Sequence, residues 1–212
     1  MIRSLFISVI LICAYSIQAQ DLKIIKLDAP DKTRGSAIMK ALNERQSIRE
    51  YSAESLRPQD LSDLLWAANG INRPDGKRTA PSCRDFKDVE MYIILPEGAY
   101  IYDAKEHVLN PVASGDYRGA VASAGQDFVK GAPLSIVLVA DLTKYGNTSE
   151  QSKLMAAVDV GIVCQNINVA CAGLGLATVP RASMDQATLR NVLKLTDKHI
   201  LLMNNPVGYP KK

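Results

Sequence analysis

The sequence predicts one domain of mixed helices and strands that is built around a long apolar helix. Between Lys153 and Leu176 the single charged residue is Asp159, which is typical of a core helix buried on almost every face. Residues 134–140, LSIVLVA, form a continuous apolar run of the kind found in central strands. Residues 91–95 and 99–103 flank the turn Pro96-Glu97-Gly98 and therefore indicate a β-hairpin.

A membrane span is the alternative interpretation of residues 153–176. Asp159, Gln165, Asn166 and Asn168 lie near the middle of this stretch. One carboxylate at the centre of a bilayer costs roughly 2.5–3.5 kcal/mol on insertion scales. We therefore expect a helix in a protein interior, where these polar groups find partners, and no stable membrane span.

The amino terminus has the pattern of a signal peptide over residues 1–19. Arg3 precedes a short apolar run, and a cleavage point follows Ala19, although Ile17 is an unusual residue in the third position before the cut. No twin arginine is present, which favours export of the unfolded chain. We expect an exported, periplasmic protein whose mature domain covers residues 20–212.

Cysteines and charge exclude several classes of protein. The mature chain keeps three cysteines, Cys83, Cys164 and Cys171, without a CxxC spacing, so neither a disulfide framework nor a zinc site is expected. Removing Arg3 leaves 24 basic against 22 acidic residues, and the basic residues are dispersed, which argues against a nucleic-acid binder. His107 and His199 lack metal-ligand spacing, and no GxSxG motif or P-loop occurs.

The first chemical motif follows a polar leader (20–34) and a helix over residues 35–45. Arg45, Ser47 and Arg49 alternate along the chain, so all three side chains lie on the same side of an extended segment. Three such donors suit a phosphate. The alternative is that two arginines near a helix end simply interact with its negative dipole.

A second helix and a loop come next. LRPQDLSDLLWAANGIN predicts a helix that begins near Pro58 and ends at Asn69-Gly70, with Leu64 and Leu65 on its buried face. A polar loop then leads to residues 80–85, APSCRD.

The rest of the chain completes the prediction. We expect an irregular connection over residues 105–116, a helix over 117–129, a polar loop over 143–151, a strand over 176–180, a helix over 184–195 and a strand over 199–203. Gly173-Leu174-Gly175 does not match a dinucleotide fingerprint, because Thr178 replaces the third glycine and the motif follows a helix. A helix cap is the better interpretation.

Six segments in this order resemble the FMN-dependent nitroreductase family, and together they span essentially the whole mature chain. They are RQSIREY, LSDLLWAANGI, RTAPSCRDF, DVEMYIIL, GLGLATVP and PVGYPK. The resemblance implies a homodimeric α+β fold: a three-layer α/β/α sandwich with a mixed, mostly antiparallel sheet and FMN bound in the subunit interface.

The resemblance also implies roles for individual residues. Arg45, Ser47 and Arg49 would hold the flavin phosphate and ribityl chain. Pro81 and Ser82 of the other subunit would lie against the isoalloxazine ring. The remaining expected contacts are backbone groups near the ring at Pro180 and Arg181, the Arg181 side chain at the phosphate, and Lys211 at the phosphate.

Two of these expected contacts have alternatives. The family usually carries Asn where this chain has Asp85, and an ionised carboxylate only accepts hydrogen bonds and opposes the charge of reduced flavin. Asp85 is therefore either a flavin contact or a surface loop residue. Lys211 is either a phosphate ligand or part of a solvated chain end.

The sequence thus predicts an exported FMN oxidoreductase without an assigned side-chain acid or base, since the cofactor carries the chemistry in such enzymes. By resemblance, NAD(P)H would reduce the flavin and a nitroaromatic or quinone would reoxidise it. Because NAD(P)H is cytoplasmic, two alternatives remain open: a flavin dehydrogenase acting on a peptide or small molecule, and a non-catalytic flavin-binding or electron-transfer protein.

Overall fold

The fold centres on one seven-stranded sheet with helices on both faces. The computed structural model describes residues 21–122 and 125–212, so the expected signal peptide lies outside the described residues. The strand order is β1-β4-β3-β2-β5-β7-β6, and every pair of neighbours is antiparallel. The strands are β1 (Ile25–Lys26), β2 (Val89–Ile94), β3 (Gly98–Asp103), β4 (Val108–Ser114), β5 (Leu134–Asp141), β6 (Ala177–Thr178) and β7 (His199–Gly208).

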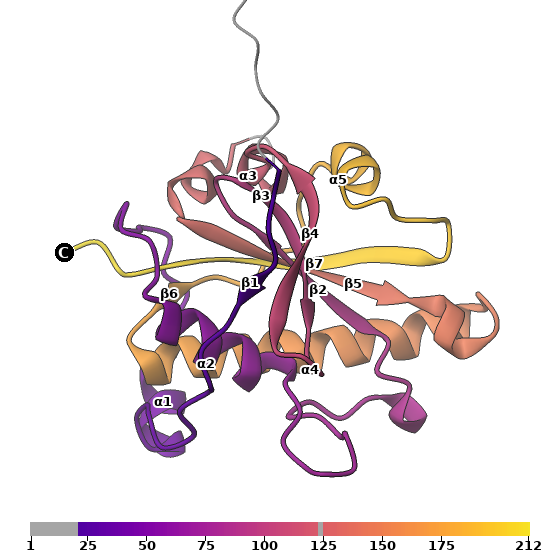
Figure 1. The fold of residues 1–212 in the computed structure, drawn as a ribbon, viewed down its shortest axis with the longest axis horizontal. Coiled ribbons are helices and arrows are strands. Elements are labelled where there is room, and N and C mark those ends of the chain that lie inside the picture. Colours follow the sequence, from indigo (N-terminus) through magenta and orange to yellow (C-terminus); the bar gives the residue numbers. More distant parts are fainter. Residues whose placement is uncertain (1–20, 123–124) are drawn as a thin grey trace, which may run out of the picture.

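Helices cover the two faces of the sheet and make three layers (Figure 1). One face carries α1 (Ile38–Glu44), α2 (Pro58–Asn69) and α4 (Glu150–Leu174), and the other carries α3 (Arg118–Val121) and α5 (Gln186–Val192). The expected α/β/α sandwich is therefore confirmed, although the sheet is entirely antiparallel in the described residues where a mixed sheet was expected.

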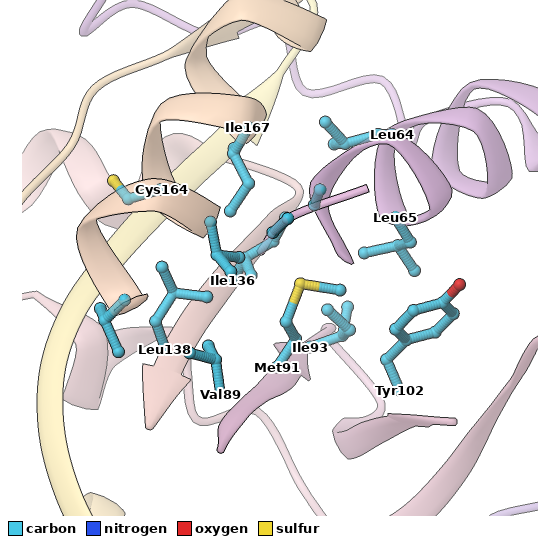
Figure 2. Packing of buried hydrophobic residues seen from close by; sticks show 14 of the residues in the cluster. Leu64, Leu65, Val89, Met91, Ile93, Tyr102, Ile136, Leu138, Cys164 and Ile167 are labelled. Atoms are coloured by element: carbon cyan, nitrogen blue, oxygen red, sulfur yellow. The ribbon is translucent and has the colours of Figure 1, made fainter. Parts of the chain in front are cut away.

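Side-chain alternation along β5 explains why the sheet has two buried faces. Ile136 and Leu138 pack into the core beneath α2 and α4, whereas Val137 and Val139 pack into the core beneath α3 and α5. All eight residues of β5 are buried, as the continuous apolar run predicted. Figure 2 shows Ile136 and Leu138 between the sheet and Ile167 of α4.

The long helix α4 has the expected position but not the expected burial. The Ser149 side chain accepts a hydrogen bond from the Ser152 N–H at its start, and Gly175 ends it with a left-handed φ of 72°. Leu154 and Val158 are 58% and 46% exposed, so the prediction of burial on almost every face is wrong for one chain. This outer side of α4 is apolar surface left without cover within the chain.

Polar side chains of α4 find partners inside the protein. Asp159 accepts a hydrogen bond from the Cys83 N–H at 2.8 Å, Asn166 donates to the Ala68 carbonyl, and Asn168 donates to the Cys164 carbonyl. By length and composition alone α4 is apolar enough to cross a membrane. Its packing against α1, α2 and the sheet is that of a core helix.

Two predicted segments differ from the structure. Residues 108–114, expected to be irregular, form β4. Pro111 is tolerated there because β1 pairs only with Val108 and Leu109, and because Pro111 lies opposite Tyr100 next to a register shift, so its missing N–H interrupts no regular ladder. The single helix expected over residues 117–129 is wrong, since α3 ends at Val121 and a 3₁₀ helix, η2, covers Asp127–Gly131. Gly125, with φ of 76°, lies between them and is incompatible with one continuous helix.

The contact between α4 and the sheet gives a test of the core. Ile167→Ala removes a fully buried side chain and should lower the free energy of unfolding by about 2–5 kcal/mol. The control Ile24→Ala, at a side chain that is 57% exposed, should change it by less than about 0.5 kcal/mol. Urea denaturation measures both, and equal effects of the two changes would contradict the assigned core.

Candidate functional site

The segment that joins α1 to the rest of the chain carries the predicted phosphate ligands. The Ile48 N–H donates to the Thr178 carbonyl at 3.0 Å, which fixes the segment beside β6. Ser47 and Arg49 are exposed and Arg45 is half-buried. Within the described part of the chain, the guanidinium groups of Arg45 and Arg49 form no hydrogen bond or ion pair, so both are available to an anion.

The carboxyl-terminal tail runs alongside this segment. The Ser52 N–H donates to the Tyr209 carbonyl at 2.8 Å, and the Lys211 N–H donates to the Glu50 carbonyl at 3.3 Å. The Tyr209 hydroxyl donates to Asp60 of α2 at 2.5 Å, which anchors the tail further. Lys211 is therefore held next to the arginine segment instead of lying on a free chain end.

Four of the predicted contacts thus gather at one end of the molecule, and we call this group the cationic rim: Arg45, Ser47, Arg49 and Lys211. A hollow of about 850 Å³ opens beside the tail and is lined in part by Tyr51, Tyr209 and Lys211.

Arg181 lies close to the rim, but its side chain is engaged inside the protein. The guanidinium donates to the Val121 carbonyl at 3.0 Å, to Asn204 Oδ1 at 2.7 Å and to Gln126 Oε1 at 2.7 Å. Burial lowers the Arg181 pKa from its ordinary value. The expectation that this side chain reaches a phosphate is therefore corrected: it links α3, β7 and the loop before η2.

The backbone at Pro180 and Arg181 is also different from the expectation. The Arg181 N–H and carbonyl both pair with Asn204, at 2.9 and 2.7 Å, and Pro180 has no N–H to donate. The Pro180 carbonyl and ring remain, and Pro180 lines a second hollow of about 250 Å³ together with Arg49 and Arg181.

The predicted ring contacts lie on a separate loop, residues 81–87, which we call the 81–87 loop. It contains η1, a 3₁₀ helix over Cys83–Asp85, and the Ser82 hydroxyl accepts a hydrogen bond from the Lys87 N–H at 2.9 Å. Pro81 is exposed and Ser82 is half-buried. Arg84, Asp85 and Lys87 all have left-handed φ values, of 49°, 59° and 53°, so the loop is held in a conformation that L residues rarely adopt.

The left-handed backbone suggests a reason for the residue type at position 85. Asp and Asn tolerate this conformation better than other non-glycine residues. Asp85 therefore meets the same backbone demand as the Asn that the resemblance leads one to expect. Its carboxylate is exposed and forms an ion pair with Lys87 at 3.0 Å.

The two groups of predicted contacts lie at different positions along the axis of α4. The 81–87 loop is attached to Asp159, whereas the cationic rim is attached to Thr178, just past the end of the helix at Leu174. Asp159 and Leu174 are separated by roughly 22 Å along a helix of 1.5 Å rise per residue. One chain therefore does not bring the rim and its own 81–87 loop together.

A buried carboxyl pair lies beneath the 81–87 loop, and sequence reasoning did not find it. Asp88 is fully buried and Asp159 is 2% exposed. The Tyr145 hydroxyl lies 3.1 Å from Asp159 Oδ2 and 3.4 Å from Asp88 Oδ2. Burial, followed by the hydrogen bond and charge of Asp159, raises the Asp88 pKa to about 7. Nothing in the sequence marks two aspartates so far apart as partners.

A third cluster lies where three strands end. His199 Nε2 is 3.8 Å from Glu90 and 4.0 Å from Asp141, on β7, β2 and β5. The Thr196 N–H donates to His199 Nδ1, which leaves the proton of a neutral ring on Nε2, toward the carboxylates. Spacing in the sequence could not reveal this cluster, because strand pairing alone brings the three residues together.

Comparisons with known proteins agree with this geometry. The model of the Nitroreductase family matches residues 42–209. A protein classed as a nitroreductase from Methanocaldococcus jannaschii is 29% identical over 204 residues, 91% of this chain and 95% of its own.

Solved structures agree as well. The crystal structure described as a nitroreductase from Ralstonia eutropha JMP134 has a TM-score of 0.82 at 33% identity, over 89% of this chain and 90% of its own. An FMN-dependent nitroreductase from Clostridium difficile R20291 shares the fold, with a TM-score of 0.57 at 21% identity over 82% of this chain and 88% of its own. Sequence motifs, fold and relatives therefore agree that the chain belongs to the nitroreductase family of oxidoreductases.

Proposed function

We propose that this protein is an FMN-dependent oxidoreductase that passes electrons from a reduced donor to a small organic acceptor. The observation that carries the proposal is the cationic rim: two arginines that no described residue pairs with, a hydroxyl and a lysine of the tail, all held on paired backbone segments in a chain of this family. The Clostridium difficile relative of the same fold is described as FMN-dependent.

The rim fits a flavin phosphate on chemical grounds. A phosphate group carries up to two negative charges and several acceptor oxygens, and Arg guanidinium groups bind it through paired N–H donors. Arg45 and Arg49 are not committed to carboxylates of the described chain, and the Ser47 hydroxyl offers a further donor. In this proposal Lys211 adds a point charge from the tail.

The separation of the two residue groups supports a site shared by two subunits. Ile38, Met39 and Leu42 of α1, together with Leu154 and Val158 of α4, are large apolar side chains that are at least 46% exposed in one chain. Burying such side chains against a second copy is favourable at about 25 cal/mol per Å². We propose a homodimer formed through this layer, in which the 81–87 loop of one subunit faces the rim of the other.

The cationic rim and the 81–87 loop have different roles in the proposed site. Bound FMN supplies the reversible two-electron chemistry, and the protein supplies position and electrostatics. The rim binds and orients the phosphate end, Pro81 and Ser82 lie against the ring, and Asp85 accepts hydrogen bonds near its polar edge. Arg45 and Arg49 also offset negative charge in the site. No side chain is assigned as a general acid or base.

The expected signal peptide bears on the electron donor. We propose that the protein is exported to the periplasm, on the basis of the pattern in residues 1–19. That location favours a donor other than NAD(P)H, so a flavin dehydrogenase acting on a peptide or small molecule is the second candidate. For the first candidate, the FMN-dependent oxidoreductase that takes electrons from NAD(P)H, the proposed acceptor is a nitroaromatic or a quinone.

The absorption spectrum of the purified mature chain tests the proposal directly. We expect an oxidised-flavin spectrum after incubation with FMN, and bleaching when a competent donor is added without oxygen. NADH and NADPH are added first, and peptide or small-molecule donors follow. Absence of any flavin spectrum would overturn the cofactor assignment. If the bound flavin is bleached by a peptide or small-molecule donor but not by NADH or NADPH, the second candidate, a flavin dehydrogenase, is selected.

The rim gives a quantitative prediction. Arg45→Ala with Arg49→Ala should weaken FMN binding by at least about 100-fold, because two charge-assisted contacts worth about 1.5–3 kcal/mol each are lost. Fluorescence titration measures the FMN Kd. Lys105→Ala, at an exposed side chain beyond β3, is the matched control and should leave the Kd unchanged. An unchanged FMN Kd in the double variant would contradict the assignment of the cationic rim as the phosphate site.

The shared site requires a dimer, and the exposed side of α4 tests it. Leu154→Arg should weaken self-association by at least tenfold, because it places a charge in the apolar interface. Sedimentation velocity at several concentrations measures this, with Ile24→Arg on the far edge of the sheet as control. A wild-type chain that stays monomeric at all concentrations while binding FMN would contradict the shared site.

A further inference from the structure

We propose that Asp88 and Asp159 share one proton at neutral pH and that this proton holds the 81–87 loop in the position needed by the flavin site. The first half of this inference concerns the chain alone. The second half rests on the proposed function, because it assigns the loop to the ring of the cofactor.

The contacts of the pair require the proton. Both carboxyl groups are almost completely buried, and both lie within hydrogen-bond distance of the same Tyr145 hydroxyl. Two ionised carboxylates have no hydrogen to place between them and repel each other, so one of them must be neutral. Among the described residues no lysine or arginine forms an ion pair with either one, so no cation replaces the proton.

The groups that face the pair come from two 3₁₀ helices, η1 and η3 (Leu142–Tyr145). Asp159 lies on α4, and Asp88 lies just before β2. The Tyr145 hydroxyl comes from η3, and the Cys83 thiol of η1 is close enough to Tyr145 to act on it electrostatically. Asp88 Oδ1 has no hydrogen-bond partner within the described residues, which is the costly state for an ionised oxygen but a mild one for a neutral carboxyl.

The pair is connected to the loop by a direct hydrogen bond. Asp159 Oδ2 accepts from the Cys83 N–H at 2.8 Å, at the start of η1. The Phe86 ring packs edge-on against Tyr145, with 4.8 Å between ring centroids. Since the loop keeps three left-handed residues, it depends on such anchors to hold its conformation. Repulsion within a doubly ionised pair would displace Asp159 or Asp88 and weaken both anchors.

The direction of the pH effect follows from the raised pKa. Asp88 binds its proton more tightly in the folded state, with a pKa of about 7, than in the unfolded chain, where the usual value is 3.8. Its contribution to stability is therefore fully present below about pH 4 and is lost as the pH rises through about 7. The loop should open most readily at alkaline pH.

Hydrogen exchange at the Cys83 amide tests the proton without needing FMN. In the wild type, protection corrected for the intrinsic exchange rate should decrease as the pH rises from about 4 to about 7, by up to tenfold per pH unit for one proton, and should level off above that. Asp88→Asn keeps the shape without the charge and should remove this decrease. Tyr145→Phe loses a hydroxyl that favours ionised Asp88, so it should shift the decrease to higher pH. Glu106→Gln, at an exposed carboxylate, should behave like the wild type.

These outcomes separate the two halves of the inference. Wild-type protection that does not change with pH, or changes equally in Asp88→Asn, would overturn proton sharing. If Asp88→Asn does not fold, the direction of the Tyr145→Phe shift decides the question, since an unshifted or acid-shifted decrease would overturn it.

FMN binding then tests the link to the site. The ratio of the wild-type FMN Kd to that of Asp88→Asn should rise as the pH approaches 7 and stay high above it, a comparison in which titration of the FMN phosphate cancels. A ratio that stays constant while protection changes would overturn the link between loop and flavin. Failure of both proteins to bind FMN at any pH would overturn the proposed function and this link, while leaving proton sharing intact.

Discussion

The packing of α4 across the sheet is the contact on which the rest of the structure depends. Its apolar side meets β5 and α2, and its polar residues are satisfied by the elements around it: the 81–87 loop meets Asp159, α2 meets Asn166, and Asn205 of β7 donates to Asn168. Each of these bonds ties a different part of the chain to one rigid axis. The helix therefore acts as the frame that determines where every loop of the candidate site is held.

A rigid frame of this length also separates what it holds. The 81–87 loop is bonded to Asp159 of α4, and the segment of the cationic rim is bonded to Thr178, just past the end of α4. Asp159 lies roughly 22 Å from that end of the helix, so neither segment can approach the other within one subunit. Helix α4 leaves Leu154 and Val158 uncovered, and α1 leaves Ile38 and Met39 uncovered. The same layer that separates the two groups therefore offers the apolar surface through which a second subunit could reunite them.

The sequence predicted the elements whose signal is local. Local sequence predicted the apolar run of β5, the hairpin of β2 and β3, and the limits of α2, because each depends on residues that are neighbours in the chain. The sequence also placed Lys211 beside the arginine segment, although only through the family resemblance. β4 was missed because Pro111 argues against a strand until its position in the sheet is known.

The parts that could not be predicted depend on contacts between distant residues. Arg181 was expected to face a phosphate, but its burial and its bonds to α3 and β7 come from the packing of three elements. Asp88 meets Asp159 only because α4 packs beneath η1 in the folded chain. The spacing of residues in the sequence does not predict that the two side chains come together. The exposure of Leu154 also could not be predicted, since an apolar residue type does not reveal whether the side chain is buried by its own chain or by a second one.

The position of β7 in the sheet has a consequence for how the protein is made. This strand, His199–Gly208, comes after α4 and β6 in the chain, yet it pairs with β5 along eight positions and lies between β5 and β6. A ribosome-bound chain therefore lacks an internal strand of this sheet until residues 199–208 have been translated. Until then β6 has no partner among the described strands and β5 pairs with β2 alone, so this sheet can be completed only after α4 has been made.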